Sequence, residues 1–243
     1  MGSTKQLDQI VVILHHPQEA MNIGAVVRAM KNMGIRQLRL VQPVAFEHAD
    51  ILRLAHRCDD ILAEMTIYQA LEDALADLIF VVGTAAITHH KRPLTQDIRG
   101  LASTLVARTD HGQVGILFGQ EDDGLDNVAL DHCHLVAMLP SNPAYPALNL
   151  AQSVLLFLYE LRMASVELPP AATTPPAALA THAALEELIG LSEELLQAIQ
   201  FFRYNPAVVM RTLRQILYRA EITQEEQGLL MAIVRKLRRQ ADR

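Results

Sequence analysis

Three segments of the sequence combine polar side chains with glycines in a way that suits a ligand site. They span 22–34, 117–125 and 142–151, and each joins a strand-like run to a loop or to the start of a helix. In open α/β sheets, ligands bind where strands end and the following loops begin. We therefore expect ligand-binding residues in these segments, and the polar side chains that stand out are Asn22, Arg28, Glu121 and Asn149.

Each of these side chains also has an ordinary structural role. Asn22 and Asn149 could each cap a helix, and Arg28 could be a solvated arginine. The run that begins at Glu121 reads Glu-Asp-Asp-Gly, which is common turn chemistry. On the expected helix, Gly24 lies one turn before Arg28, and its missing side chain would leave room for a polar ligand. Residue types and spacing alone leave both interpretations open.

The signatures of several common enzyme classes are missing. No G-x-G-x-x-G follows the first strand-like run, and the sequence contains no G-x-x-x-x-G-K-[ST], H-E-x-x-H or G-x-S-x-G. The chain has ten histidines, but His15-His16, His89-His90 and the pair in 132–134 do not combine into a zinc-binding spacing. We therefore expect no metal site.

The charge is distributed unevenly along the chain. The formal net charge is -6, which alone argues against a nucleic-acid partner. Residues 203–243 nevertheless carry nine Lys and Arg against four Asp and Glu, which is +5, so the remainder is -11. This basic tail is compatible either with RNA contact or with a solvated helix face.

Composition also bounds the compartment and the size of the fold. A chain of 243 residues has room for one α/β domain and a small appendage. Two cysteines, Cys58 and Cys133, are too few for a disulfide framework, and we expect both to be buried thiols. No apolar run is long enough for a membrane span, so we expect a soluble, cytoplasmic protein without a membrane partner.

Hydrophobic periodicity predicts an α/β fold followed by a helical appendage. Strand-like runs are expected at 10–14, 37–41, 78–82, 114–118 and 135–139. Helices are expected at 21–33, 67–76, 126–133 and 148–166, and beyond the proline-rich stretch at 183–190, 193–204, 206–220 and 224–240. This alternation favours a mostly parallel sheet. We divide the chain into an α/β domain (1–168), a proline-rich linker (169–182) and a helical extension (183–243).

The order of the three polar segments points to a known family. They read N-x-G-x-x-x-R-x-x-x-x-x-G, F-G-x-E-x-x-G-L and L-N-L-A, and this order resembles the motifs of SpoU-type RNA ribose 2′-O-methyltransferases of the SPOUT superfamily. Residues 205–221 resemble the helical extension of the TrmJ group within that family. The resemblance covers almost the whole chain. It implies an α/β SPOUT domain with a C-terminal trefoil knot, an exception to the general rule against knots.

The resemblance also implies a reaction and partners. The chain is expected to transfer a methyl group from S-adenosylmethionine to a ribose 2′-hydroxyl, a group that RNA has and DNA lacks. A pyrimidine nucleotide of tRNA is the expected substrate, with rRNA as the alternative. The family is dimeric with cofactor pockets near the subunit interface, so we expect a homodimer.

Site residues are carried over position by position. The catalytic residues are expected to be Arg28, Asn22, Glu121 and Asn149. A guanidinium stays protonated, so Arg28 would stabilise the forming alkoxide, and the proton acceptor stays open. The residues expected to bind the cofactor are Thr84, Ala85, Ala86, Gly119, Leu139, Pro146, Ala147 and Leu148.

Two positions depart from the family pattern. Ala147 stands where the family usually has serine, and Gln120 stands where TrmJ enzymes commonly have arginine. Together with the acidic body of the chain, the loss of a hydroxyl and of a charge keeps one other function open, and a second alternative stands beside it. One is a non-catalytic RNA-binding or assembly factor on the same fold, and the other is a methyltransferase acting on a small molecule.

Overall fold

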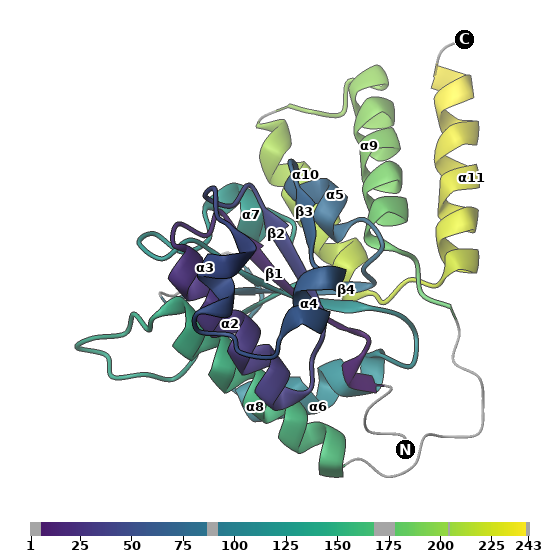
Figure 1. The fold of residues 1–243 in the computed structure, drawn as a ribbon. Helices are drawn as coiled ribbons and strands as arrows, with labels where there is room; N and C mark the ends of the chain where they lie inside the picture. The colour runs from purple at the N-terminus through teal and green to yellow at the C-terminus, as the bar shows by residue number, and fades with distance from the viewer. Residues whose placement is uncertain (1–5, 87–91, 168–177, 204, 242–243) are drawn as a thin grey trace.

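A seven-stranded parallel sheet lies at the centre of the computed structural model, which describes residues 6–86, 92–167, 178–203 and 205–241 (Figure 1). The strand order is β3-β2-β1-β6-β4-β7-β5. The strands are β1 (Ile10–His15), β2 (Gln37–Val41), β3 (Thr66–Tyr68), β4 (Phe80–Thr84), β5 (Leu94–Thr95), β6 (Val114–Phe118) and β7 (Leu135–Ala137).

Helices cover both faces of the sheet. One face packs against α2 (Ala20–Met33), α6 (Ile98–Arg108) and α8 (Leu150–Glu167), with the short α3 (His48–Leu52) and α4 (Asp59–Glu64) beside α2 (Figure 1). The other face packs against α5 (Leu71–Leu75) and α7 (Asn127–Asp131). The burial of both faces of β1 explains why its sequence is almost entirely apolar. Val12 and Leu14 enter the first core cluster and Val11 and Ile13 the second, because both faces of a parallel strand are buried.

Three long helices follow the sheet and form a helical module, which we define as the described residues from 178 to 241. They are α9 (His182–Ala198), α10 (Pro206–Arg219) and α11 (Gln224–Ala241), and α9 and α11 lie side by side (Figure 1). The module is attached to the sheet domain through backbone hydrogen bonds. His182 N donates to Leu78 O at 2.7 Å, and Ala183 N donates to Ala76 O at 2.9 Å. The module therefore packs on the side of the sheet where α5 lies.

Most predicted elements are present with small shifts at their ends, but two predictions are wrong. The segment 67–76 is not one helix, because the β-branched and aromatic residues Thr66–Tyr68 extend the sheet beside β2 and the helix begins only at Leu71. The two helices expected at 183–190 and 193–204 are one helix, α9, which ends at Ala198. Gly190 does not interrupt it, since a mid-helix glycine costs only about 1 kcal/mol.

The division into domains stays a prediction, but the last residues of the expected linker, 178–182, belong to the helical module and are bonded to the rest of it. Ala180 N donates to Ile222 O at 2.8 Å, and Leu179 forms a β-bridge with Thr223. The proline-rich part of the linker, 169–176, and His89-His90 lie outside the described residues. The trefoil knot also stays a prediction, because strand order and pairing do not describe how the chain threads.

Both cysteines are buried thiols, as predicted. Cys58 is packed in the first core cluster and Cys133 in the second. Burial raises the pKa of the Cys133 thiol to about 12, so this thiol is unreactive at neutral pH. No helix of the described chain has the length and apolarity that crossing a membrane requires.

Candidate active site

A cavity of about 330 Å³ opens where β4, β6 and β7 end. Parallel strands finish at the same edge of a sheet, so loops far apart in the sequence meet there. The structure brings together all eight residues that were expected to bind the cofactor. The cavity is lined by Thr84, Ala85, Ala86, Gly119, Leu139, Pro146, Ala147 and Leu148, and in addition by Phe118, 120–125, Leu150, Ser153 and Phe157.

Three of the four expected catalytic residues form one hydrogen-bonded chain. The Glu121 carboxylate accepts a hydrogen bond from Asn22 Nδ2 at 2.9 Å and another from the backbone N of Gln18 at 2.9 Å. Asn149 Nδ2 donates to Asn22 Oδ1 at 3.1 Å. Hydrogen bonds to an ionised carboxylate are stronger than neutral ones. Glu121 therefore holds the start of α2 and, through Asn22, the loop that leads into α8.

Asn22 and Asn149 could each have been a helix cap or a residue of the site, and the structure gives a different answer for each. Glu19, not Asn22, occupies the N-cap position of α2, so the side chain of Asn22 is available to Glu121. Asn149 has both roles. Its Oδ1 accepts a hydrogen bond from Ala151 N at 2.9 Å at the start of α8, while its Nδ2 binds Asn22.

Arg28 is the expected catalytic residue that the structure leaves apart from the others. It is exposed on α2, does not line the cavity, and forms no hydrogen bond or ion pair in the part of the chain that the structure describes. The expected free space at Gly24 is absent. A Cβ at Gly24 would lie 2.9 Å from Ile51 O, so the missing side chain lets α3 pack against α2 instead of admitting a ligand.

Gly119 has a structural reason to be glycine. A Cβ at this position would lie 2.0 Å from the backbone carbon of Gly124, a distance that no side-chain adjustment can relieve. Gln120 and Gly124 form a β-bridge that closes the turn over Gly119. The atoms that lie close to Gly119 are therefore backbone atoms of this chain, at Gly124 and Leu125. The turn that contains these residues forms one wall of the cavity.

The two departures from the family pattern are accommodated without strain. Gln120 Oε1 accepts a hydrogen bond from Gln18 Nε2 at 3.3 Å, and Gln120 Nε2 donates to Asp123 Oδ2 at 3.2 Å. Ala147 is exposed at the rim of the cavity. Neither position buries an unsatisfied polar group.

We expect Ala147→Ser to leave the fold intact and to raise the rate of turnover by at most about tenfold. The side chain is exposed, so the extra hydroxyl meets no steric penalty, and one neutral hydrogen bond contributes about 0.5–1.5 kcal/mol. Thermal unfolding and single-turnover methyl transfer are the measurements. A variant that melts well below the parent protein would show that the loop 141–149 tolerates no added atom.

Residue-based reasoning missed several contributors to this site. Gln18 is the clearest, because its bond to Glu121 is made by the backbone N, which side-chain chemistry could not reveal, while its side chain binds Gln120. Ser153 and Phe157 line the cavity from α8, one and two turns after Asn149. The helical spacing of these three residues was the available signal.

The basic tail is largely balanced by acids once the helical module folds. Residues 183–243 contain nine Lys and Arg and eight Asp and Glu, which gives +1. Arg214 pairs with Glu186, Arg235 with Glu187 and Arg238 with Glu194, all of them acids of α9. The cations without an ion pair on the described part of the tail are Arg203, Arg219, Lys236 and Arg239. The charge therefore gives little support to RNA binding by the tail.

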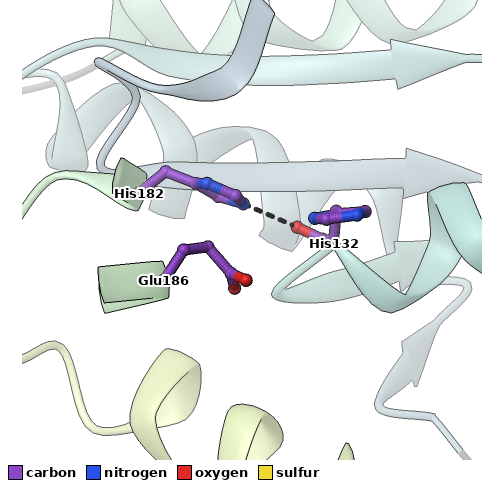
Figure 2. A group of neighbouring side chains, drawn as sticks. All are labelled: His132, His182 and Glu186. Atoms are coloured by element: carbon purple, nitrogen blue, oxygen red, sulfur yellow. Dashed lines mark hydrogen bonds between the residues drawn. The ribbon is translucent and has the colours of Figure 1, made fainter. Parts of the chain in front are cut away.

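One group of side chains in the described structure lies close enough together to hold a metal ion. It consists of His132, His182 and Glu186, whose ligand atoms lie within 4.8 Å of one another (Figure 2). Arg214 already binds the Glu186 carboxylate through Nε at 3.0 Å and Nη2 at 2.9 Å, and the Tyr218 hydroxyl donates to the same carboxylate. A metal ion would have to displace a guanidinium cation, so the group is better described as a polar contact between module and sheet domain.

Burial and hydrogen bonding set the protonation of His182, of the neighbouring His134 and of Glu186. Burial lowers the pKa of His182 to about 4 and holds that of His134, which stacks on Tyr218 at 4.0 Å, well below its usual value. Burial also opposes ionisation of Glu186, but the hydrogen bonds from Arg214 and Tyr218 outweigh it and lower the Glu186 pKa to about 2. At neutral pH both histidines are neutral and Glu186 is charged.

Acidification should therefore weaken the packing of the module. An unfolded histidine titrates near pH 6.5, so the unfolded chain binds more protons than the folded one between pH 6.5 and about 4. We expect the free energy of unfolding to fall by about 2 kcal/mol from pH 7.5 to 5 because of His182. Urea unfolding at both pH values measures it, and His182→Gln should reduce the dependence to the part that the buried His134 contributes. If the free energy of unfolding changes equally with pH in the two proteins, His182 is not the cause.

Comparison with known proteins shows which family this chain resembles. A model of the SpoU rRNA Methylase family matches residues 9–159. The tRNA (cytidine/uridine-2′-O-)-methyltransferase TrmJ of Cronobacter sakazakii is 34% identical over 233 residues, which are 94% of this chain and 95% of that protein. The tRNA (cytidine/uridine/adenosine-2′-O-)-methyltransferase TrmJ of Pseudomonas aeruginosa is 40% identical over 159 residues, which are 65% and 62%. The crystal structure of TrmJ from Z. mobilis ZM4 superposes with a TM-score of 0.79 at 29% identity, covering 93% of this chain and 98% of that one.

Proposed function

This chain belongs to the SpoU rRNA methylase family, and we propose that it transfers the methyl group of S-adenosylmethionine to a ribose 2′-hydroxyl of tRNA. The observation that carries the proposal is the cavity at the ends of β4, β6 and β7 with the Glu121, Asn22 and Asn149 network beside it. The relatives that act on cytidine and uridine support a pyrimidine nucleotide as the target. rRNA is the alternative substrate.

The residues around the cavity fit the proposed cofactor. The volume lies at the lower end of the range for small-molecule sites. Leu139, Leu148 and Phe118 offer apolar walls for a purine ring, and the carboxylates of 121–123 border the cavity, which favours a ligand with a sulfonium and an ammonium group. When bound, S-adenosylmethionine supplies an electrophilic methyl group.

The chain's own residues would prepare the ribose hydroxyl, which is a weak nucleophile that loses a proton as it attacks. We assign Arg28 to the developing alkoxide, because a permanently charged guanidinium stabilises negative charge without titrating. Glu121 would act by positioning, since it binds Asn22 and the Gln18 backbone. Asn22 and Asn149 would then hold the loop 141–149 against the cavity.

The assembly that we propose is a homodimer formed through α8. This helix has a set of exposed apolar side chains in the single chain, namely Leu155, Leu156, Tyr159, Met163 and Val166. Exposed apolar patches of this kind mark interaction surfaces. Arg28 does not line the cavity of its own chain. Its proposed role therefore requires that Arg28 of one subunit lie near the cavity of the other, which a homodimer would allow. We place the enzyme in the cytoplasm, where tRNA is its substrate.

The dimer is tested by placing a charge in the proposed interface. We expect light scattering to report a dimer for the parent protein and a monomer for Leu156→Glu, because a buried unpaired carboxylate is costly. Leu229→Glu is the matched control, since Leu229 is an exposed leucine on α11 and its substitution should leave the dimer intact. A parent protein that is monomeric at micromolar concentration would refute the proposal.

The reaction is tested by mass spectrometry of nucleosides. Purified protein, S-adenosylmethionine and unmodified tRNA should yield a 2′-O-methylated pyrimidine nucleoside, and rRNA fragments should be compared in parallel. Methylation of rRNA alone would correct the substrate. Binding of cofactor and RNA without any methylated nucleoside would identify a non-catalytic RNA-binding protein instead.

A further inference from the structure

Arg92 is a cation with a largely buried side chain, and it is not one of the residues that line the cavity. Its side chain is 9% exposed and makes four hydrogen bonds, all to α7. Nε and Nη2 donate to Asp131 Oδ1 at 3.2 and 2.7 Å, Nη1 donates to Asn127 Oδ1 at 3.1 Å, and Nη2 also donates to Asn127 O at 3.0 Å. One guanidinium therefore binds both ends of α7.

Helix α7 continues one wall of the cavity. Asp126 caps it by accepting a hydrogen bond from Ala129 N at 2.7 Å, and the preceding residue, Leu125, lines the cavity at the end of the 119–125 turn. With five residues, α7 is too short to be stable by itself and depends on tertiary contacts. A shift of α7 would move Leu125 and the turn with it.

The backbone next to Arg92 is bonded to the strand that leads to a second wall of the cavity, at Leu139. Arg92 lies two residues before β5, and Pro93 O accepts a hydrogen bond from Val136 N at 2.9 Å. Met138 N then donates to Thr95 O at 2.9 Å, which holds the chain that enters the cavity at Leu139. Arg92 thus joins α7 to the segment that is paired with β7.

We infer that Arg92 is a positioning residue for cofactor binding, which holds the Leu125 wall and the Leu139 wall of the cavity in register. The inference rests on the proposed cofactor site and adds a residue with no contact to the ligand. Asp131 has a second cationic neighbour, Arg211 of α10, at 3.4 Å. Arg211 approaches from the helical module, so the module reaches the same carboxylate that positions α7.

Arg92→Ala should raise the dissociation constant for S-adenosylhomocysteine about tenfold, because the lost charged hydrogen bonds leave α7 to be ordered by the ligand. The Michaelis constant for S-adenosylmethionine should rise equally, while kcat at saturating cofactor stays within about threefold. Arg92→Lys should recover part of the affinity, since a lysine keeps the charge but reaches fewer acceptors. Calorimetry and steady-state kinetics with tRNA are the measurements.

Arg36→Ala is the matched control. It removes another Arg–carboxylate pair, with Glu64 at 2.6 Å, but that pair is exposed and distant in sequence from the cavity loops, so affinity should change less than twofold. A folded Arg92→Ala protein with unchanged affinity overturns the inference. If Arg92→Ala does not fold, Arg92→Lys decides, and parent-like affinity in that variant overturns it too. A parent protein that does not bind S-adenosylhomocysteine refutes the proposed cofactor site and this inference together.

Discussion

Replacing Arg28 by alanine is expected to slow single-turnover methyl transfer by about 10²–10³-fold, which is the scale of removing one preorganised electrostatic donor. Affinity for S-adenosylhomocysteine should stay within about twofold, because Arg28 does not line the cavity. The measurement is rapid-quench methyl transfer to a tRNA that mass spectrometry has verified as substrate, with the binding of cofactor and tRNA assayed separately.

Two further substitutions make this result specific to Arg28. Arg28→Lys should recover the rate only in part, because an ammonium cannot reproduce the planar guanidinium fork. Arg53→Ala removes a different arginine, 79% exposed and just after α3, and should leave the rate unchanged. Parent-like chemistry in Arg28→Ala, with both ligands bound, would show that Arg28 is a solvated surface residue.

The second large effect is expected at Gly119. The added methyl group of Gly119→Ala would overlap the backbone of Gly124 and Leu125, at 2.0–2.3 Å, so the turn must open. Such overpacking costs about 1–3 kcal/mol, and we expect cofactor affinity to fall about 10- to 100-fold because the same turn lines the cavity. Calorimetry with S-adenosylhomocysteine measures the change.

The control for Gly119 is a glycine with free space around it. A Cβ at Gly190, inside α9, would meet no atom within 4 Å, so Gly190→Ala should bind cofactor normally and unfold at a higher temperature. If Gly119→Ala also binds normally, the turn has enough freedom to absorb a side chain, and the wall that it forms is not fixed by the Gly119–Gly124 contact.

The fold was predictable from the sequence where one local pattern determined the outcome. The apolar runs at 10–14 and 114–118 became β1 and β6 because a strand covered on both faces must be apolar throughout. The edge strand β3 was misassigned as helix, since Thr66–Tyr68 is only three residues long and α5 begins only two residues after it. Periodicity cannot resolve so short an element.

The polar residues of the candidate site were easier to predict from the sequence than the residues that line its cavity. Asn22, Glu121 and Asn149 have polar side chains that drew attention by themselves, and the structure joins them. Thr84–Ala86 and Ala147 carry almost no reactive chemistry, so only the family resemblance pointed to them. The role of Gly24 was misread because its neighbour, Ile51, is brought to it by the tertiary packing of α3 on α2.

The module's attachment to the sheet could not be foreseen for the same reason. His182 and Leu78 are about a hundred residues apart, and the bond between them involves backbone atoms that every residue has. The charge excess counted from residue 203 was likewise incomplete, since the acids that balance it belong to α9. Charge patterns become interpretable only when the partners on neighbouring helices are known.

The strand order has a consequence for how the protein is made. Strand β7 lies between β4 and β5, both of which precede it in the chain, and β6 likewise lies between β1 and β4. During synthesis from the N-terminus, β4 and β5 therefore leave the ribosome before β7, which pairs with both of them in the folded sheet. Sheets assembled from such distant segments form slowly. A nascent chain that stalls before β7 would leave the edges of β4 and β5 unpaired, and unpaired strand edges can pair with other chains.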